Sequence, residues 1–298
     1  MTRRSLQTAA LGAAVTLLTL PVIATASEGE KFDPSLEFKT APYGPELKFG
    51  PIDLSINKAV VYLLITTAII CIGGLLAVRG GLRLRPGKTQ TIVEMIYDFA
   101  DEQIFKPVIP SHGKRVGVPK WFPYLATLFL FIGVNNLISF IPLPMGHETG
   151  TFPAGLPDLG LYAATANINV TLTLAIFTFL ATHVVGVKTH GVGGYLKTWV
   201  PDAPGAVKPF IAGIEVLSQL LRLVSLSVRL FANLLAGHLL IIMAGGFAVL
   251  VGSVLGALGI PFALFFYVFE WVLVAGLQAF IFALLSGVYI GYAMEAPH

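Results

Sequence analysis

Charged and polar side chains interrupt residues 214–242, a stretch that is otherwise as apolar as a membrane-spanning helix. Among the polar side chains in it are those of Glu215, Ser218, Arg222, Ser225, Arg229, Asn233 and His238. A charged group at the centre of a bilayer costs roughly 3 kcal/mol even on the most lenient scale. Each of these groups therefore needs a partner or water, and ionisable side chains inside a membrane are suited to binding and passing on ions.

The spacing of these residues predicts a polar stripe on one side of the helix. At about 100° per residue, six of these side chains, from Glu215 to Asn233, project into a sector roughly 80° wide. Lipid offers no hydrogen-bond partners, so the stripe must face protein or a water-filled cavity. His238 points on the order of 180° from Arg229 and would serve another neighbour. A purely structural interpretation, in which the arginines snorkel or pair with Glu215, suits Arg222 better than Arg229.

Two motifs resemble a known family. Residues 225–238 read SLSVRLFANLLAGH and residues 277–289 read LQAFIFALLSGVY. In this order they resemble segments of subunit a of the rotary F-type ATP synthase, and the resemblance is strongest over residues 215–292. It implies a stationary, non-catalytic subunit that lies against a rotating c-ring, with peripheral-stalk subunits as further partners. Ions would reach the ring through two offset half-channels.

The resemblance also implies roles for individual residues. Arg229 would face the ring, whose small subunits each carry one carboxyl group in mid-membrane. An arginine stays charged even in a poor solvent, so it favours the ionised form of an approaching carboxyl group. Glu215 stands near the cytoplasmic half-channel, and Asn233 and Gln278 stand at amides close to the arginine. The secondary candidates for the ion path are Arg222, Ser225 and Asn167.

His238 and Glu270 are the expected proton-transferring pair, because a neutral imidazole can pass a proton between its two nitrogens. The spacing of the acid departs from the family pattern. There the partner lies seven residues before the glutamine, which is the position of Trp271 here, whereas Glu270 lies eight before Gln278. One residue rotates a helical side chain by about 100°. Glu270 therefore reaches His238 only if a local bulge restores the register; otherwise it pairs elsewhere.

The composition is that of a polytopic membrane protein. Of 298 residues, 55% are hydrophobic and only 12% are charged, and the net charge of +3 is too small to indicate a nucleic-acid partner. No glycine-rich loop ends in Gly-Lys-Ser or Gly-Lys-Thr, and the six histidines are scattered. We therefore expect no nucleotide site, no metal site and no cofactor.

Apolar segments predict an all-α fold with about five membrane crossings. The five segments are residues 59–78, 121–141, 166–187, 210–251 and 261–293. The first three have the length of an upright spanning helix, whereas the last two exceed it and must tilt or bend. The last two would form a long helical hairpin, and we expect residues 59–298 to form a single transmembrane domain.

The distribution of charge predicts how the chain is oriented in a bacterial inner membrane. Residues 1–26 read as a secretory signal, with an uncleaved anchor as the alternative, and residues 27–58 as a polar external arm. Eight lysines and arginines lie within residues 79–120, which the positive-inside rule places in the cytoplasm. Five crossings then put the mature N-terminus outside and the C-terminus in the cytoplasm.

Two features between the crossings have alternative interpretations. Residues 91–105 predict an amphipathic cytoplasmic helix, which could lie on the membrane surface or pack on other helices. Asn135 and Asn136 are expected to hydrogen-bond a neighbouring helix rather than to line an ion path. Asn167 stands where the family commonly has an aspartate, and an amide cannot store a proton. This substitution weakens any role of the third crossing in carrying protons.

Other classes of membrane protein would use the polar residues differently. A stand-alone secondary ion transporter often has internal repeats and broken helices in both halves, whereas the polar residues here gather in the last third of the chain. A structural scaffold without an ion path leaves the stripe around Arg229 unexplained. The sequence thus favours a proton-translocating stator subunit bound to membrane lipid, with Na⁺ as the alternative ion.

Overall fold

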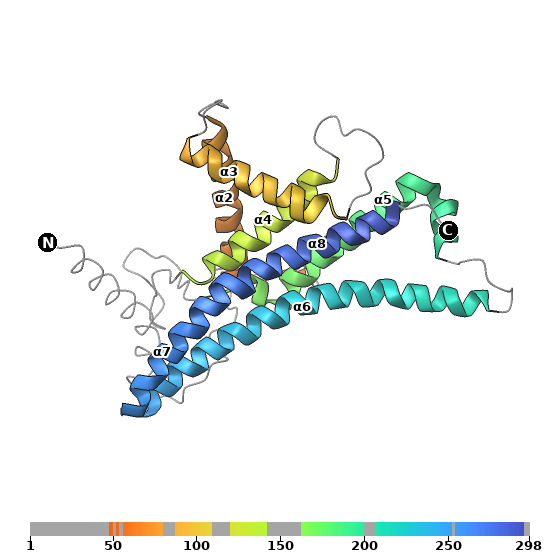
Figure 1. Cartoon of the computed structure of the whole chain (residues 1–298). Coiled ribbons are helices and arrows are strands. Elements are labelled where there is room, and N and C mark those ends of the chain that lie inside the picture. Colours follow the sequence, from red (N-terminus) through yellow and green to blue (C-terminus); the bar gives the residue numbers. More distant parts are fainter. Residues whose placement is uncertain are drawn as a thin grey trace. The chain divides into compact units, whose positions relative to one another are not determined.

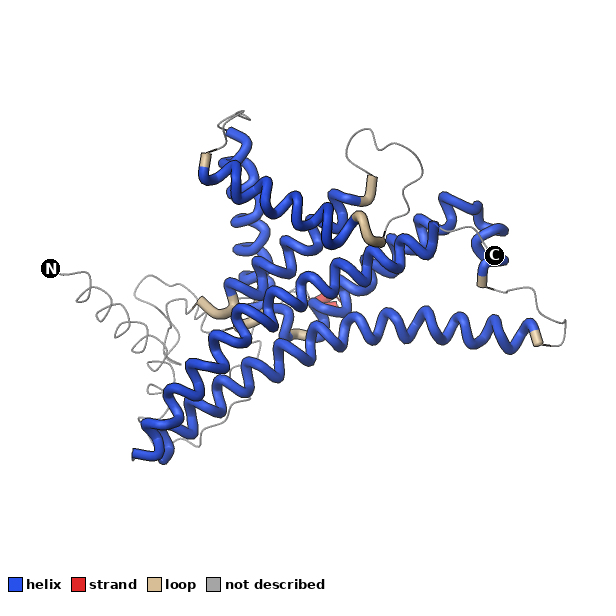
Figure 2. Tube along the Cα trace, viewed as in Figure 1, coloured by secondary structure: helices blue, strands red, loops and turns tan. Residues whose placement is uncertain are grey.

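The computed structural model describes residues 48–49, 52–53, 56–79, 87–108, 120–141, 162–199, 207–251 and 254–294. The predicted signal segment, residues 1–26, lies outside these ranges, as does most of the predicted external arm. The strands β1 (Lys48–Phe49) and β2 (Ile52–Asp53) pair in an antiparallel manner. Almost all of the rest of the described chain is helical (Figure 1 and Figure 2). The predicted all-α fold class is confirmed.

The helices of the described chain follow in chain order. They are α2 (Lys58–Arg79), α3 (Lys88–Phe99), η2 (Ala100–Phe105), α4 (Phe122–Ile138), η3 (Ala164–Ala166), α5 (Ile168–Thr198), α6 (Lys208–Val251), α7 (Val254–Phe269), η4 (Glu270–Val274) and α8 (Ala275–Met294). Two of them, η2 and η4, are π-helical turns that continue the preceding α-helix. A π-helical turn fits one extra residue into the helix, and it changes the direction of every side chain beyond it.

Long apolar helices make this a polytopic membrane protein. Four helical segments of the described chain are long and apolar enough to cross a membrane: Lys58–Ala77, Ile168–Thr198, Lys208–Ile241 and Pro261–Met294. Phe122–Ile138 is a shorter apolar helix. Many bulky apolar side chains on these helices are exposed, among them Leu64, Phe177, Phe210 and Phe265. Lipid or other subunits must cover such surfaces in a membrane.

The chain divides into two compact units. The first unit contains residues 1–64, 135–164 and 233–275, and the second contains residues 65–134, 165–232 and 276–298. The C-terminal hairpin contributes to both units: the end of α6 with α7 and η4 belongs to the first, and the start of α6 with nearly all of α8 to the second.

The core of the second unit explains where the amphipathic segment packs. One cluster of buried residues in it consists of Ala100, Ile104, Phe105, Phe122, Leu125, Val185, Ala283 and Ile290. None of the residues in α3 is buried, whereas η2 buries three side chains in this core. The aromatic rings of Tyr97 and Phe122 lie 4.7 Å apart, between centroids. The C-terminal part of the predicted amphipathic helix thus packs on other helices.

Hydroxyl groups connect the helices of the second unit. The hydroxyl oxygen of Thr178 on α5 lies 3.1 Å from that of Tyr124 on α4 and 3.3 Å from that of Ser286 on α8. The hydroxyl oxygen of Thr171 on α5 lies 3.2 Å from that of Ser227 on α6. Apolar burial does little to hold helices together in lipid, so hydrogen bonds of this kind help to fix them. The bond to Ser227 fixes α6 two residues from Arg229.

Candidate functional site

The part of the polar stripe on α6 from Ser225 to Arg229 lies on a face that the described chain leaves open. In the second unit, Leu226 and Leu230 are buried, whereas Ser225 and Arg229 are exposed. Burial of the leucines places α6 against its own unit and turns the arginine away from it. A cation within a membrane-crossing helix that its own chain does not cover must meet water or another protein.

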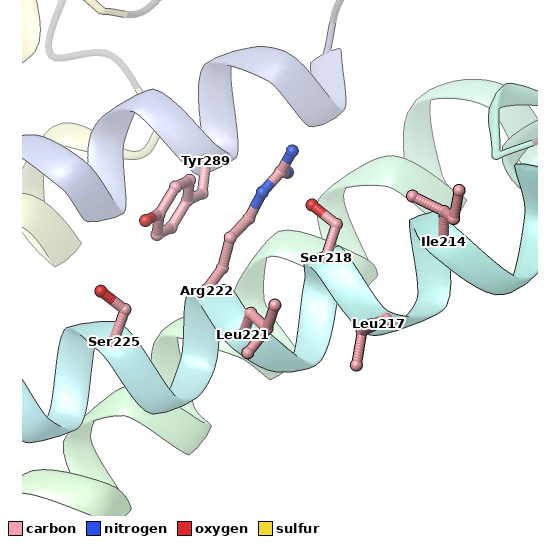
Figure 3. Close-up of a pocket in the computed structure, with 7 residues that line it drawn as sticks. All are labelled: Ile214, Leu217, Ser218, Leu221, Arg222, Ser225 and Tyr289. Atoms are coloured by element: carbon pink, nitrogen blue, oxygen red, sulfur yellow. The ribbon is translucent and has the colours of Figure 1, made fainter.

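An open cavity adjoins the stripe in the second unit (Figure 3). Its volume is about 330 Å³, and its walls come from Ile214, Leu217, Ser218, Leu221, Arg222, Ser225 and Tyr289. Arg222 extends from α6 towards α8, and its guanidinium carbon lies 5.7 Å from the centroid of the Tyr289 ring. This distance is within the range of a cation–π interaction. Three members of the predicted stripe thus line one cavity.

Glu215 interacts along its own helix. Its Oε1 atom accepts a hydrogen bond of 2.8 Å from Nε2 of Gln219, one turn further along α6. Both side chains are partly buried. Within the described part of the chain, Glu215 forms no ion pair with Arg222 or Arg229, so the structural pairing considered from the sequence is not formed.

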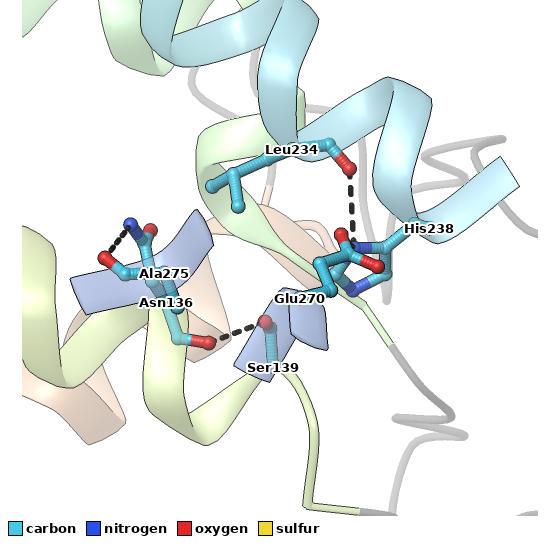
Figure 4. A network of polar contacts seen from close by, with 6 residues as sticks. All are labelled: Asn136, Ser139, Leu234, His238, Glu270 and Ala275. Atoms are coloured by element: carbon cyan, nitrogen blue, oxygen red, sulfur yellow. Dashed lines mark hydrogen bonds and ion pairs between the residues drawn. The ribbon is translucent and has the colours of Figure 1, made fainter. Parts of the chain in front are cut away.

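The first unit contains a buried acid–base pair (Figure 4). Nδ1 of His238 lies 3.1 Å from Oε1 of Glu270, and the two side chains are only 5% and 3% exposed. Nδ1 also lies 3.2 Å from the carbonyl oxygen of Leu234. A carbonyl oxygen can only accept, so the tautomer with hydrogen on Nδ1 donates to both oxygens. The imidazole packs 4.9 Å from the Phe140 ring, between centroids.

The π-helical turn η4 sets the direction of Glu270. The backbone N–H of Ala275 donates to the carbonyl oxygen of Glu270, five residues earlier. The extra residue offsets the one-residue shift from the family pattern, so Glu270 is buried while Trp271 is 42% exposed. Nδ2 of Asn136 donates to the carbonyl oxygen of Ala275 at 3.3 Å, which anchors the end of the turn. For Asn136, the expected bond to a neighbouring helix is confirmed.

Each member of the pair has a second polar atom that forms no hydrogen bond with the described part of the chain. Nε2 of His238 and Oε2 of Glu270 are buried, and among the described residues no group hydrogen-bonds to either. A buried polar atom left unpaired costs about 1–3 kcal/mol. These two atoms are therefore the places where water, or another group that carries a proton, would be stabilised. The arrangement can take up a proton at one end and release it at the other.

The remaining predicted residues lie at several places. Asn233 is exposed on α6 in the first unit, and Gln278 is buried on α8 in the second. Asn167 caps α5, because its Oδ1 accepts a 3.0 Å hydrogen bond from the backbone N–H of Asn169. An N-cap is a structural role that suits an amide as well as an acid. Within the described ranges, no three His, Cys, Asp or Glu side chains gather in a group that could hold a metal ion.

Sequence reasoning did not assign a role at these sites to three residues that shape them. Gln219 follows Glu215 by four residues, the spacing at which side chains meet on a helix, so this signal was available. Tyr289 ends the second motif, but the sequence does not show that it faces Arg222. Gly237 makes room for Glu270, since a Cβ atom there would overlap the carboxyl group. No spacing rule reveals such an approach between two helices.

Known proteins are similar to the chain over most of its length. The family model described as ATP synthase A chain matches residues 60–291. ATP synthase subunit a from Rubrobacter xylanophilus is 38% identical over 84% of this chain and 88% of its own length. Proteins with the same name from Pelagibacter ubique and Bradyrhizobium diazoefficiens are each 34% identical, over 89% and 90% of this chain and 99% and 100% of their own length. The chain thus belongs to the ATP synthase A chain family.

Proposed function

We propose that the chain is the stationary, non-catalytic subunit that conducts protons to and from the rotating c-ring of an ATP synthase, with Na⁺ as the alternative ion. The observation that carries this proposal is the buried pair of His238 and Glu270, 3.1 Å apart on helices that are apolar enough to cross a membrane. An ionisable pair within a membrane marks an ion pathway. Membership of the ATP synthase A chain family supports placing this pathway in an ATP synthase.

The pair can transfer a proton in balanced steps. A proton that binds Nε2 of His238 converts the ring to an imidazolium ion. The ring then passes the Nδ1 proton to Oε1 of Glu270, which leaves a neutral imidazole and a neutral carboxylic acid. Release of the carboxyl proton to the next acceptor, and return of the ring to its first tautomer, reset the pair. These steps form one half-channel, and the same steps in reverse serve transport in the opposite direction.

The stripe on α6 supplies the other half-channel and the contact with the ring. Glu215, Ser218 and Arg222 border the route on the cytoplasmic side, where the cavity gives water access. Arg229 meets each carboxylate of the ring, favours its ionised form and resists a direct leak of protons between the half-channels. Asn233 and Gln278 adjust hydrogen bonding beside it. Ser225 lines the route as a secondary member, whereas Asn167 contributes through its helix cap.

We place the chain in a bacterial inner membrane with its N-terminus outside and its C-terminus in the cytoplasm. The cluster of basic residues within 79–120 supports this orientation. Residues 1–26 would be removed as a signal, residues 27–58 would form an external arm, and residues 59–298 would form the membrane domain. The peripheral-stalk subunits would hold this domain still while the ring turns.

ATP-driven proton pumping by inverted vesicles that carry the whole complex tests the role of the pair. Replacing Glu270 by Gln keeps the shape of the side chain and removes its titratable proton. We expect Glu270→Gln to lower the pumping rate at least about tenfold, because general acid–base groups contribute on the order of a hundredfold or more. Glu94→Gln, an exposed acid on α3, is the matched control and should pump normally. Normal pumping by Glu270→Gln would refute the relay.

A further inference from the structure

The stripe on α6 carries two arginines, and the structure holds them differently. Arg222 and Arg229 are seven residues apart, so their side chains leave the helix within about 20° of the same direction. Arg229 is exposed, whereas Arg222 is partly buried beside Tyr289. Two cations thus start from the same face of one helix, but of the two only Arg229 is left exposed by the described residues.

The Tyr289 ring offers the guanidinium group of Arg222 a favourable position. The guanidinium carbon lies 5.7 Å from the ring centroid, and a cation is attracted to the face of an aromatic ring within about 6 Å. Figure 3 shows the side chain reaching across the cavity to α8, beside Tyr289 and away from Leu217. Among the described residues no carboxylate lies within ion-pair distance of Arg222. The aromatic ring is therefore the group that fixes where this cation lies.

Release of Arg222 would change what a passing carboxylate meets. Two helical turns separate the arginines by about 10 Å along the axis, and charges interact strongly over such distances where water is scarce. A free Arg222 would offer a second cation to a carboxylate that has left Arg229. That carboxylate would stay ionised at the point where it must take up a proton before it enters the lipid.

We propose that Tyr289 is a positioning residue that keeps Arg222 docked against α8, so that the passing carboxylates meet Arg229, the one arginine of the stripe that the described residues leave exposed. This inference rests on the proposed function, in which Arg229 contacts the ring. In this proposal the cavity does more than admit water, because it provides the space in which the Arg222 side chain lies away from the c-ring.

A double-mutant cycle on the whole complex tests the inference. ATP-driven proton pumping, per assembled complex, is measured for Tyr289→Leu and Tyr289→Phe, each alone and together with Arg222→Gln. A cation–π contact at a partly exposed site corresponds to about a two- to fivefold change in population. We expect Tyr289→Leu to pump at least about twofold more slowly, and Tyr289→Phe, which keeps the ring, to match the wild type. In the Arg222→Gln background, Tyr289→Leu should have no further effect.

Two results would overturn the inference: normal pumping by Tyr289→Leu, or a loss of equal size with Arg222→Gln present, which would make Tyr289 a packing residue. Tyr292→Leu, an exposed tyrosine on the same helix, is the matched control. Immunoblots of the membranes correct for the amount of complex, and Tyr289→Met serves if the leucine variant does not assemble. The Arg229→Ala variant separates the two proposals. If Arg229→Ala does not pump but the effects of Tyr289 and Arg222 substitutions are independent, only this inference is wrong. If Arg229→Ala pumps normally, the proposed function is wrong as well.

Discussion

Gly237 on α6 has no side chain, and this absence lets the carboxyl group of Glu270 approach His238. The carboxyl group of Glu270 lies against the backbone of α6 at Gly237, where a Cβ atom would overlap it. His238 is the next residue, so the glycine and the imidazole together form the place that the carboxyl group occupies. The distance of 3.1 Å between the acid and the base depends on this close approach.

Substitution of Gly237 should therefore impair proton transfer without touching either titratable group. We expect Gly237→Ala to push the carboxyl group away from His238 and to lower ATP-driven pumping at least about tenfold, since proton transfer requires hydrogen-bond contact. Gly213→Ala is the matched control, because a Cβ atom at Gly213 on the same helix meets no atom within 4 Å.

The shorter acid provides the second arm of this experiment. Glu270→Asp shortens the side chain by one methylene group, which makes room for the Cβ atom of the alanine at position 237. The double variant Gly237→Ala/Glu270→Asp should therefore pump faster than Gly237→Ala alone. Pumping by Gly237→Ala at the wild-type rate would contradict the steric role of the glycine. If Gly237→Ala does not assemble, immunoblots will show the loss of the complex. The amount of complex formed by the double variant then tests whether the shorter acid restores assembly.

The π-helical turn η4 determines the direction of the Glu270 side chain. Its one extra residue compensates for the eight-residue spacing between Glu270 and Gln278. Deletion of Val272, an exposed residue of the turn, should yield a regular α-helix in which Glu270 stands seven residues before the glutamine and keeps its direction. We expect the deletion variant to pump within about threefold of the wild type, because the acid still faces His238.

An insertion at the same point should have the opposite effect. One alanine added after Val272 turns Glu270 by a further 100° or so and moves its carboxyl group away from His238. Pumping by the insertion variant should fall at least about tenfold. Equal rates for the deletion and the insertion would contradict the assignment of the register to η4, and immunoblots of the membranes separate this outcome from failed assembly.

Much of the architecture could be predicted because long apolar segments have few alternatives in a membrane. The polar stripe followed from helical periodicity, and the pair of His238 and Glu270 followed from the motifs together with the condition that a bulge restores the register. The bulge itself could only be stated as a condition, since one extra residue alters neither composition nor hydropathy. The contact of Tyr289 with Arg222 depends on how two distant helices pack, which one sequence does not encode in any local pattern.

For the whole molecule, the surface that remains open matters as much as the core. Most side chains in the spanning helices are not buried within the chain. On α6 the open surface includes the cation of Arg229 as well as apolar groups such as Val228. A membrane protein with such a face is incomplete alone, because lipid cannot satisfy the guanidinium group. The proposed c-ring supplies both an apolar surface and a carboxylate.

The pumping activity of Arg229→Ala is the most direct test of the role proposed for Arg229, which is to meet the carboxylates of the c-ring. Inverted vesicles that carry the whole complex are supplied with ATP, and proton uptake and ATP hydrolysis are measured together. Leu220→Ala, an exposed residue about 180° away on the same helix, is the matched control. We predict that Arg229→Ala abolishes pumping while the soluble head still hydrolyses ATP and the control pumps normally. Proton pumping by Arg229→Ala at the wild-type rate would contradict it.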